Sequence, residues 1–145
     1  MTVDVTVVRR RLERMLGEAR VLRRFQAISY ESFRNDDMAT RTVERSLQVI
    51  AQAAIDIAGH IISQQRWGVP GEYREAVLTL QKQSVISDPL ASELVHLVGM
   101  RNILVHGYLE VDLGLVHASI GPAIACVESF VRAIEKYLRE SVETE

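Results

Sequence analysis

Residues 43–61 read VERSLQVIAQAAIDIAGHI, and the spacing of their apolar side chains decides the fold class. Successive apolar positions are four, three, four, three and four residues apart, which is typical of an amphipathic helix with one buried face. The stripe consists of Val43, Leu47, Ile50, Ala54, Ile57 and Ile61. Asn35, Asp36 and Asp37 precede it and are good N-cap residues, so a long helix is expected to begin there.

The same spacing predicts further helices on both sides of this one. A first helix is expected to end near Ser29, on a stripe formed by Val5, Val8, Leu12, Met15, Ala19 and Leu22. Two glycines and a proline interrupt the pattern at residues 65–71, which are therefore expected to form a loop. A short third helix is expected over residues 73–80.

A fourth helix has a clear start signal in Ser87-Asp88-Pro89. A capping side chain stands just before a proline, whose missing N–H group costs nothing at a helix start. The helix is expected to run to about Val105, and Gly107 is placed to let it end. Its inner face is formed by Leu90, Leu94, Leu97 or Val98, and Arg101.

A fifth helix is expected after Asp112, which is positioned to cap it. Gly121-Pro122 must kink or divide this helix, because proline removes a backbone hydrogen bond and clashes one turn back. Its inner stripe consists of Leu113, Val116, Ile120, Ile124, Val127, Val131, Ile134 and Leu138. No strand-like alternation is sustained, so the sequence predicts an all-α, single-domain antiparallel bundle of four to five helices.

Length and composition limit the class of protein. The chain has 145 residues, of which 48% are hydrophobic, so a single domain over residues 1–145 is expected. Cys126 is the only cysteine, which excludes an internal disulfide and a cysteine-rich zinc site. No apolar run approaches the roughly 18 residues of a membrane helix. The first residues, MTVDVTVVRRR, lack the order of a signal peptide, so a cytoplasmic setting without a membrane partner is expected.

The charge is unevenly distributed along the chain. Seventeen basic and 19 acidic residues give a net charge of −2, which argues against a uniformly basic nucleic-acid-binding surface. Residues 9–24 nevertheless hold seven arginines against two glutamates, a local charge of +5. This segment is interpreted either as a solvated helix face or as a patch that steers RNA, and the solvated face is the favoured interpretation.

Two pairs of side chains have spacings that metal sites use. Glu93 and His96 form an E-x-x-H pair, but a di-iron bundle also needs a second such pair and two more glutamates, and no second pair exists. Asp56 and His60, four residues apart, are the other pair. Both are interpreted as surface or locally hydrogen-bonded residues, so no metal or cofactor is expected. Cys126 stands in an apolar stretch and is interpreted as a small core residue.

Residues 101–108, RNILVHGY, concentrate a cation, an amide, an imidazole and a phenol at the end of the fourth helix. On a straight helix Asn102 and His106 differ by about 40°, whereas Arg101 and His106 differ by about 140°. One straight helix therefore cannot aim both Arg101 and His106 at one small target. Either the helix opens near Gly107, or a second copy of the chain supplies the missing group.

This octet resembles the R-N-x-x-x-H-x-Y form of the signature found in HEPN-domain proteins. More narrowly, it is similar to the HepT-like ribonuclease toxins of HepT–MntA toxin–antitoxin systems. The resemblance covers roughly residues 5–140, and outside the octet it is carried by residues 41–47, 55–60, 73–75 and 85–94. It implies a HEPN-like bundle.

The resemblance also implies an activity. HEPN toxins are metal-independent endoribonucleases that act as dimers, with the Arg and His of both subunits meeting at a cleft. A histidine side chain, with an ordinary pKa near 6.5, suits either proton transfer at neutral pH. Arginine offers fixed donors to phosphate oxygens. The resemblance therefore implies that His106 is the acid–base group and Arg101 holds the scissile phosphate, while Asn102 positions His106 or the phosphate.

In HepT-like toxins the tyrosine of the H-x-Y unit receives AMP groups from a partner nucleotidyltransferase. The resemblance thus implies that Tyr108 is modified by an MntA-like antitoxin, since a bulky anion beside the cleft would repel RNA. The alternative function is a non-catalytic HEPN module that binds and assists a minimal nucleotidyltransferase. A helix that presents polar residues to a dimer cleft would also recruit Asp56 and His60.

Overall fold

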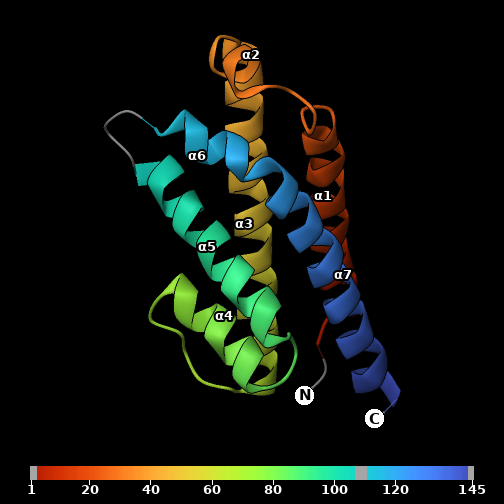
Figure 1. Ribbon diagram of the computed structural model, residues 1–145. Helices are drawn as coiled ribbons and strands as arrows, with labels where there is room; N and C mark the ends of the chain where they lie inside the picture. The colour runs from red at the N-terminus through yellow and green to blue at the C-terminus, as the bar shows by residue number, and fades with distance from the viewer. Residues whose placement is uncertain (1–2, 107–110, 144–145) are drawn as a thin grey trace.

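The computed structural model describes residues 3–106 and 111–143, with side chains as far as Ser141, and is an all-α bundle (Figure 1). No strand occurs in these ranges. The helices are α1 (Val5–Arg23), α2 (Tyr30–Arg34), α3 (Asp37–Gln65), α4 (Tyr73–Lys82), α5 (Asp88–His106), α6 (Leu113–Ala118) and α7 (Ile120–Glu143). The long helices α1, α3, α5 and α7 alternate in direction, which confirms the expected antiparallel bundle.

Helix α3 is the centre of the bundle and packs against each of the other six described helices. Every member of its predicted apolar stripe is buried, from Val43 to Ile61. An 18-residue window of α3 is long and apolar enough to cross a membrane, but 67% of that window is buried inside the bundle. The hydrophobicity of α3 is therefore that of a core helix enclosed by its neighbours.

The capping residues act largely as the sequence predicts. Of the three candidates before α3, Asp36 is the cap, and its Oδ1 accepts a hydrogen bond from the backbone N–H of Ala39 (3.1 Å). Asp112 caps α6 in the same way, and Ser87 Oγ accepts from the N–H of Leu90 (3.4 Å) at the start of α5. The predicted starts of these helices are therefore confirmed.

One boundary differs from the prediction and adds a short helix. The first helix ends at Arg23 rather than near Ser29, because Ser29 caps the separate helix α2 by accepting from the N–H of Ser32 (3.1 Å). The predicted break in the fifth helix is confirmed, and it falls at Ser119, between α6 and α7. Pro122 explains the position of this break, since it has no N–H to donate to the carbonyl of Ala118 one turn back.

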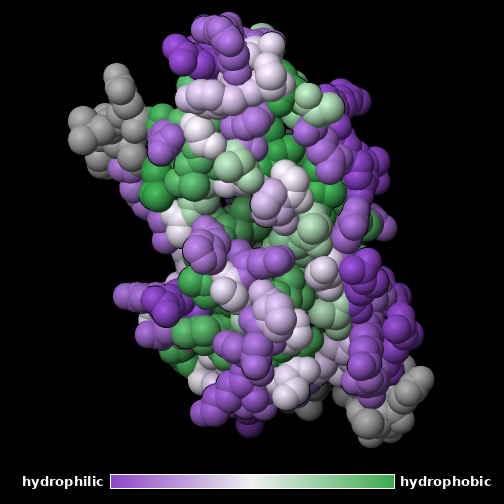
Figure 2. Space-filling view, viewed as in Figure 1, coloured by the Kyte–Doolittle hydropathy of each residue, from purple (hydrophilic) through white to green (hydrophobic). Residues whose placement is uncertain are grey.

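The surface separates by polarity along the bundle (Figure 2). Hydrophilic side chains gather along the edge formed by α7, whereas apolar surface is exposed over the middle of the same face, near α5 and α6. Large apolar side chains on these two helices that remain exposed are Ile103, Val105 and Leu115. The second half of α5, which carries the predicted site, thus lies beside exposed apolar surface.

Candidate functional site

An open cleft with a volume of about 1230 Å³ lies between α3, the start of α4 and the second half of α5. We call it the Arg101 cleft. The polar and charged side chains that line it include Arg11, Asp56, Tyr73, Arg101, Asn102 and His106. All three catalytic residues predicted from the sequence therefore line one cleft of a single chain.

The guanidinium of Arg101 is held by contacts from three helices. Its Nε donates to Oε1 of Gln52 on α3 (3.1 Å), and its Nη1 donates to Oδ1 of the neighbouring Asn102 (3.1 Å). The ring of Tyr73, the first residue of α4, lies 5.1 Å from the guanidinium carbon, within the range of a cation–π contact. Arg101 is consequently a positioned cation rather than a freely moving surface side chain.

Behind Arg101, a polar chain of contacts crosses the cleft wall to α1. Gln52 also donates from Nε2 to Oδ1 of Asp56, one turn further along α3 (2.9 Å). The other carboxylate oxygen of Asp56 lies 4.0 Å from Nε of Arg11. Asp56 therefore lies between Arg11 and Gln52, and its carboxylate interacts with both the cation of Arg11 and the amide N–H of Gln52.

His106 occupies the last residue of α5 and is exposed, as is Asn102 one turn earlier. No hydrogen bond or ion pair joins its imidazole to another described residue. Helix α5 continues unbroken to His106 although Arg101 and His106 point in different directions. The width of the cleft allows both side chains to line it. Gly107 and Tyr108 lie outside the described residues.

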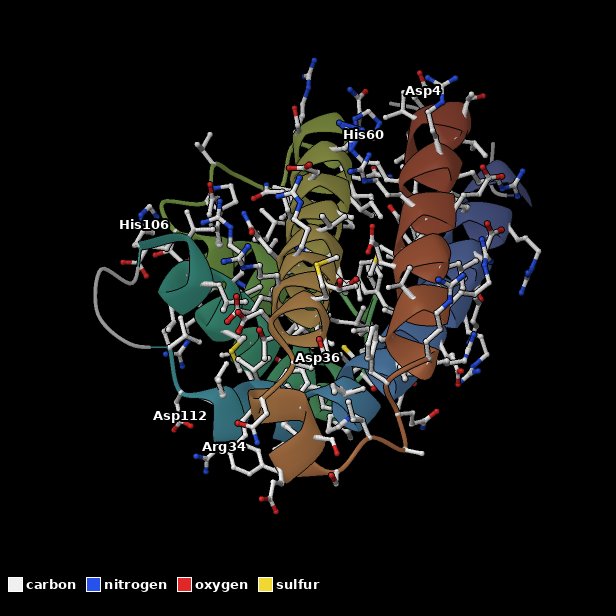
Figure 3. All side chains as sticks on the ribbon, turned by 90° about the horizontal axis from the view of Figure 1, so that it is seen from above. Asp4, Arg34, Asp36, His60, His106 and Asp112 are labelled. Carbon is white, nitrogen blue, oxygen red and sulfur yellow. The ribbon has the colours of Figure 1, made fainter. Side chains whose placement is uncertain are left out.

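Asp56 and His60 are engaged by different partners. His60 accepts a hydrogen bond at Nε2 from the backbone N–H of Asp4 (3.2 Å), and Asp56 is engaged by Gln52 and Arg11. Figure 3 shows His60 beside Asp4 and far from His106 at the end of α5. Within residues 3–106 and 111–141, no group of three or more His, Cys, Asp or Glu side chains is arranged to hold a metal ion.

The arginine-rich segment divides between two faces of α1. Arg9 makes an ion pair with Glu135 (3.2 Å) and Arg23 with Glu128 (2.5 Å), both on α7. These two arginines stabilise the contact between α1 and α7, and being exposed they each contribute little. Arg11 instead faces the Arg101 cleft. The interpretation as a solvated face therefore describes part of the segment, and Arg11 adds a cation to those of Arg74 and Arg101 at the site.

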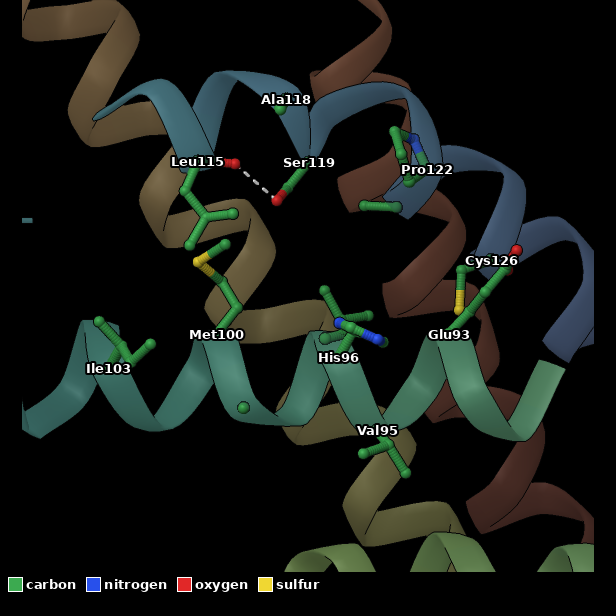
Figure 4. Close-up of a pocket in the computed structure, with 13 residues that line it drawn as sticks. Glu93, Val95, His96, Met100, Ile103, Leu115, Ala118, Ser119, Pro122 and Cys126 are labelled. Carbon is green, nitrogen blue, oxygen red and sulfur yellow. Dashed lines mark hydrogen bonds between the residues drawn. The ribbon is translucent and has the colours of Figure 1, made fainter. Parts of the chain in front are cut away.

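A separate, mostly apolar pocket of about 560 Å³ lies between α5, α6 and α7 (Figure 4). Glu93 and His96, the second pair with metal-like spacing, line it together with Met100 and Cys126. Ser119 donates from Oγ to the carbonyl of Leu115 at its edge (2.7 Å). Val95 and Gly99 of α5 line both this pocket and the Arg101 cleft, but Glu93 and His96 line only the pocket and Asp56 lines only the cleft, so the two metal-like pairs do not come together.

Cys126 is a core residue, as predicted, with 2% of its surface exposed. Burial, and secondarily the negative charge of Glu93, raise the pKa of the thiol from its ordinary value of 9.0 to about 12. The reactive species of a cysteine is the thiolate, which burial disfavours. Cys126 is thus an inert core thiol.

We expect Cys126 to resist alkylation in the folded protein. At pH 8 a pKa of about 12 leaves about a thousandfold less thiolate than the ordinary value of 9.0 does. Iodoacetamide at pH 8, followed by intact-mass analysis, should label the denatured chain within minutes and the native chain at least about a hundredfold more slowly. Equal rates in the two states would contradict the assignment.

Comparison with known proteins places this geometry in a family. Residues 15–134 match the family described as Ribonuclease HepT-like. The chain belongs to the HepT-like ribonuclease family. It is 32% identical over 136 residues to the tRNA nuclease HepT of Aphanizomenon flos-aquae, covering 94% of this chain and 92% of that protein. It is 33% identical over 118 residues to the mRNA nuclease HepT of Shewanella oneidensis, covering 80% of this chain and 89% of that protein.

Solved structures agree with this membership. The tri-AMPylated HEPN toxin of Shewanella oneidensis, solved in complex with an MNT antitoxin, superimposes with a TM-score of 0.81 at 28% identity, covering 90% of this chain and 97% of that one. The cytosolic protein YutE of Bacillus subtilis has a TM-score of 0.84 at 19% identity, covering 97% and 94%, and shows the fold alone. The expected HEPN fold, ribonuclease class and toxin–antitoxin type are thereby confirmed for this HepT-like chain.

Two residues of the site were not singled out from the sequence. Gln52 interrupts an otherwise apolar stretch of α3 and stands one turn before Asp56, so polar residues at positions 52, 56 and 60 mark one face of that helix. Tyr73 follows the loop after α3, and its position against Arg101 depends on how α4 folds back onto α5. The first signal was readable in the sequence, whereas the second required the tertiary structure.

Proposed function

We propose that this HepT-like chain is a metal-independent endoribonuclease toxin whose site is the Arg101 cleft. The observation that carries the proposal is the gathering of Arg101, Asn102 and His106 on that cleft, with the Arg101 guanidinium held in place and the imidazole unengaged. A fixed cation beside a free acid–base group suits phosphodiester cleavage. RNA, as the substrate, supplies its own nucleophile in the 2′-OH.

In the proposed reaction, the 2′-oxygen attacks the adjacent phosphorus while His106 accepts the proton of the 2′-OH. The bond from phosphorus to the 5′-oxygen breaks, and a second, protonated imidazole donates its proton to that leaving oxygen. The products are a 2′,3′-cyclic phosphate and a 5′-OH. Arg101 neutralises the charge that develops on the phosphate oxygens, and Asn102 orients Arg101 through the Nη1 contact.

The second imidazole comes from a second copy of the chain. Each copy has a single His106, and the reaction needs an acid and a base at the same time. Exposed apolar side chains next to the site support a homodimer: Ile103, Val105 and Leu115 lie on α5 and α6 with between 38% and 50% of their surface exposed. A two-fold axis near the end of α5 would bring two copies of Arg101 and His106 to one cleft.

Tyr108 is the proposed site of control, two residues beyond His106 in the sequence. An MntA-like nucleotidyltransferase antitoxin would attach AMP to its phenol oxygen, displacing pyrophosphate from ATP. The added phosphate would repel the RNA backbone from the cleft. The Shewanella oneidensis relative, described as tri-AMPylated and in complex with an MNT antitoxin, supports this pairing.

The test is to express the chain in bacteria alone and together with an MntA-like nucleotidyltransferase antitoxin. Alone, the chain is expected to arrest growth and fragment cellular RNA, because nothing restrains the cleft. With the transferase, growth should resume and the peptide that contains Tyr108 should gain one or more AMP groups in the mass spectrum. A Tyr108→Phe variant should stay toxic in the presence of the transferase, since the accepting hydroxyl is missing.

Harmless expression of the wild-type chain, with intact RNA, would favour the non-catalytic module instead. An unmodified Tyr108 peptide in cells that the transferase has rescued would overturn the AMP mechanism alone. Purified protein should also cleave RNA in EDTA, and a strict requirement for an added metal ion would contradict the metal-independent reaction.

A further inference from the structure

The donors of Arg101 are not equally available to a phosphate. Nε has one N–H group, which donates a hydrogen bond to Oε1 of Gln52 (3.1 Å). Nη1 gives one of its two N–H groups to Asn102 (3.1 Å). Nη2 carries two N–H groups and makes no hydrogen bond with a described residue. The contacts therefore direct Nη2 and the remaining N–H of Nη1 toward a ligand.

Gln52 accepts the hydrogen bond from Nε of Arg101 because its amide group has a defined orientation. A glutamine amide presents an oxygen on one side and an NH₂ group on the other, and only the oxygen attracts a guanidinium. The carboxylate of Asp56 is an acceptor, so it takes the NH₂ side (2.9 Å) and turns the oxygen toward Arg101. Without Asp56, the amide would be free to turn its NH₂ group toward the cation.

The position of Gln52 suits a residue that supports Arg101 rather than one that contacts the RNA. It is partly buried on α3, behind Arg101, whereas Asp56, Arg101, Asn102 and His106 line the cleft itself. The Tyr73 ring covers the guanidinium at 5.1 Å. Three helices thus hold Arg101, and Gln52 is the contact that comes from the central helix α3.

We infer that Gln52, with its amide oriented by Asp56, is a positioning residue that aims the Nη2 edge of Arg101 at the scissile phosphate. This inference depends on the proposed ribonuclease function. The effect of Gln52 falls on the transition state. A misaligned guanidinium still attracts RNA, but it no longer contacts the charge that develops on the phosphate. Loss of Gln52 should therefore lower kcat more than it raises KM.

The test compares two substitutions of Gln52 with a control on the same helix. Gln52→Leu removes the acceptor and should lower kcat/KM for RNA cleavage about tenfold to a hundredfold, mostly in kcat. Gln52→Glu keeps an acceptor for Nε but sets its carboxylate against that of Asp56, so kcat/KM should recover to a value between those of Gln52→Leu and the wild type. Gln64→Leu, twelve residues along α3 and outside the cleft lining, should behave as the wild type.

A second readout follows Arg101 itself in the dimeric protein labelled with ¹⁵N-arginine. The Nε–H resonance of Arg101, assigned by its absence in Arg101→Lys, should shift and exchange faster with water in Gln52→Leu and remain protected in Gln52→Glu. A merely structural role would instead lower the melting temperature of both Gln52 variants and leave this resonance in place.

Two results would overturn the inference: wild-type kcat/KM in Gln52→Leu, or no better activity in Gln52→Glu than in Gln52→Leu. Failure of the proposed function is distinguishable from both. If the wild-type chain cleaves no RNA, the ribonuclease proposal fails, while the Nε–H resonance still reports whether Gln52 positions Arg101.

Discussion

His106→Ala is expected to lower kcat/KM for RNA cleavage by about 10²- to 10⁴-fold, because it removes the proposed acid–base group from both copies of the proposed dimer. The fold should be unaffected, since the imidazole is exposed and makes no hydrogen bond with a described residue. The measurement is initial cleavage of a fluorescent RNA substrate under conditions where the wild type turns over. Growth arrest on expression should disappear in parallel.

His96→Ala is the matched control for this variant. His96 is also an exposed histidine on α5, but it lines the apolar pocket between α5, α6 and α7 and not the Arg101 cleft. Its substitution should leave cleavage within about threefold of the wild type, as expected for a residue that meets neither RNA nor the reacting atoms. Wild-type activity in His106→Ala, or an equal loss in His96→Ala, would refute the assignment of His106.

Ile57→Ala is expected to destabilise the protein by about 2–5 kcal/mol, through the loss of buried methyl groups and the cavity left behind. Ile57 is 0% exposed and lies in the middle of α3, the helix that packs against each of the other six described helices. Such a loss is a large part of the roughly 5–15 kcal/mol of a typical domain. Urea unfolding followed by circular dichroism, at fixed protein concentration, measures it.

Met38→Ala provides the comparison on the same helix. The Met38 side chain is 74% exposed, so its truncation should change the free energy of unfolding by no more than about 0.5 kcal/mol. Similar losses in the two variants would mean that α3 is not the buried centre of the fold. The corresponding fall in melting temperature for Ile57→Ala is roughly 5–15 °C.

The parts of the fold that depend on local chemistry were predictable. The apolar stripe of α3 and the caps at Asp36, Ser87 and Asp112 rely on contacts within a few residues, and the structure confirms them. The end of α1 was misjudged, because an apolar pattern that continues past Arg23 does not reveal that Ser29 starts a new helix. The spacing of apolar residues shows which face of a helix is buried, but it does not show where the helix ends and the chain turns.

The candidate site likewise has a part that local sequence indicates and a part that depends on tertiary packing. Arg101, Asn102 and His106 stand within six residues of sequence, and the resemblance of this stretch to the HEPN signature was what allowed the chemistry to be proposed. Their surroundings come from distant segments: Gln52 from α3, Tyr73 from α4 and Arg11 from α1. The polar face of α3 that carries Gln52 is readable in the sequence, but no local pattern predicts that these residues meet at the Arg101 cleft, because each contact depends on how two helices pack.

The sequence by itself determined that this chain is a helical bundle with a cation, an amide and an imidazole at the end of one helix, since helical periodicity and motif spacing are local properties. Only the tertiary structure decided that Arg101 and His106 line the same cleft despite the roughly 140° between them on the helix. It also decided which donors of Arg101 remain for a phosphate. The physical reason is that directed hydrogen bonds between helices depend on their packing, which brings together residues such as Gln52 and Arg101, 49 positions apart.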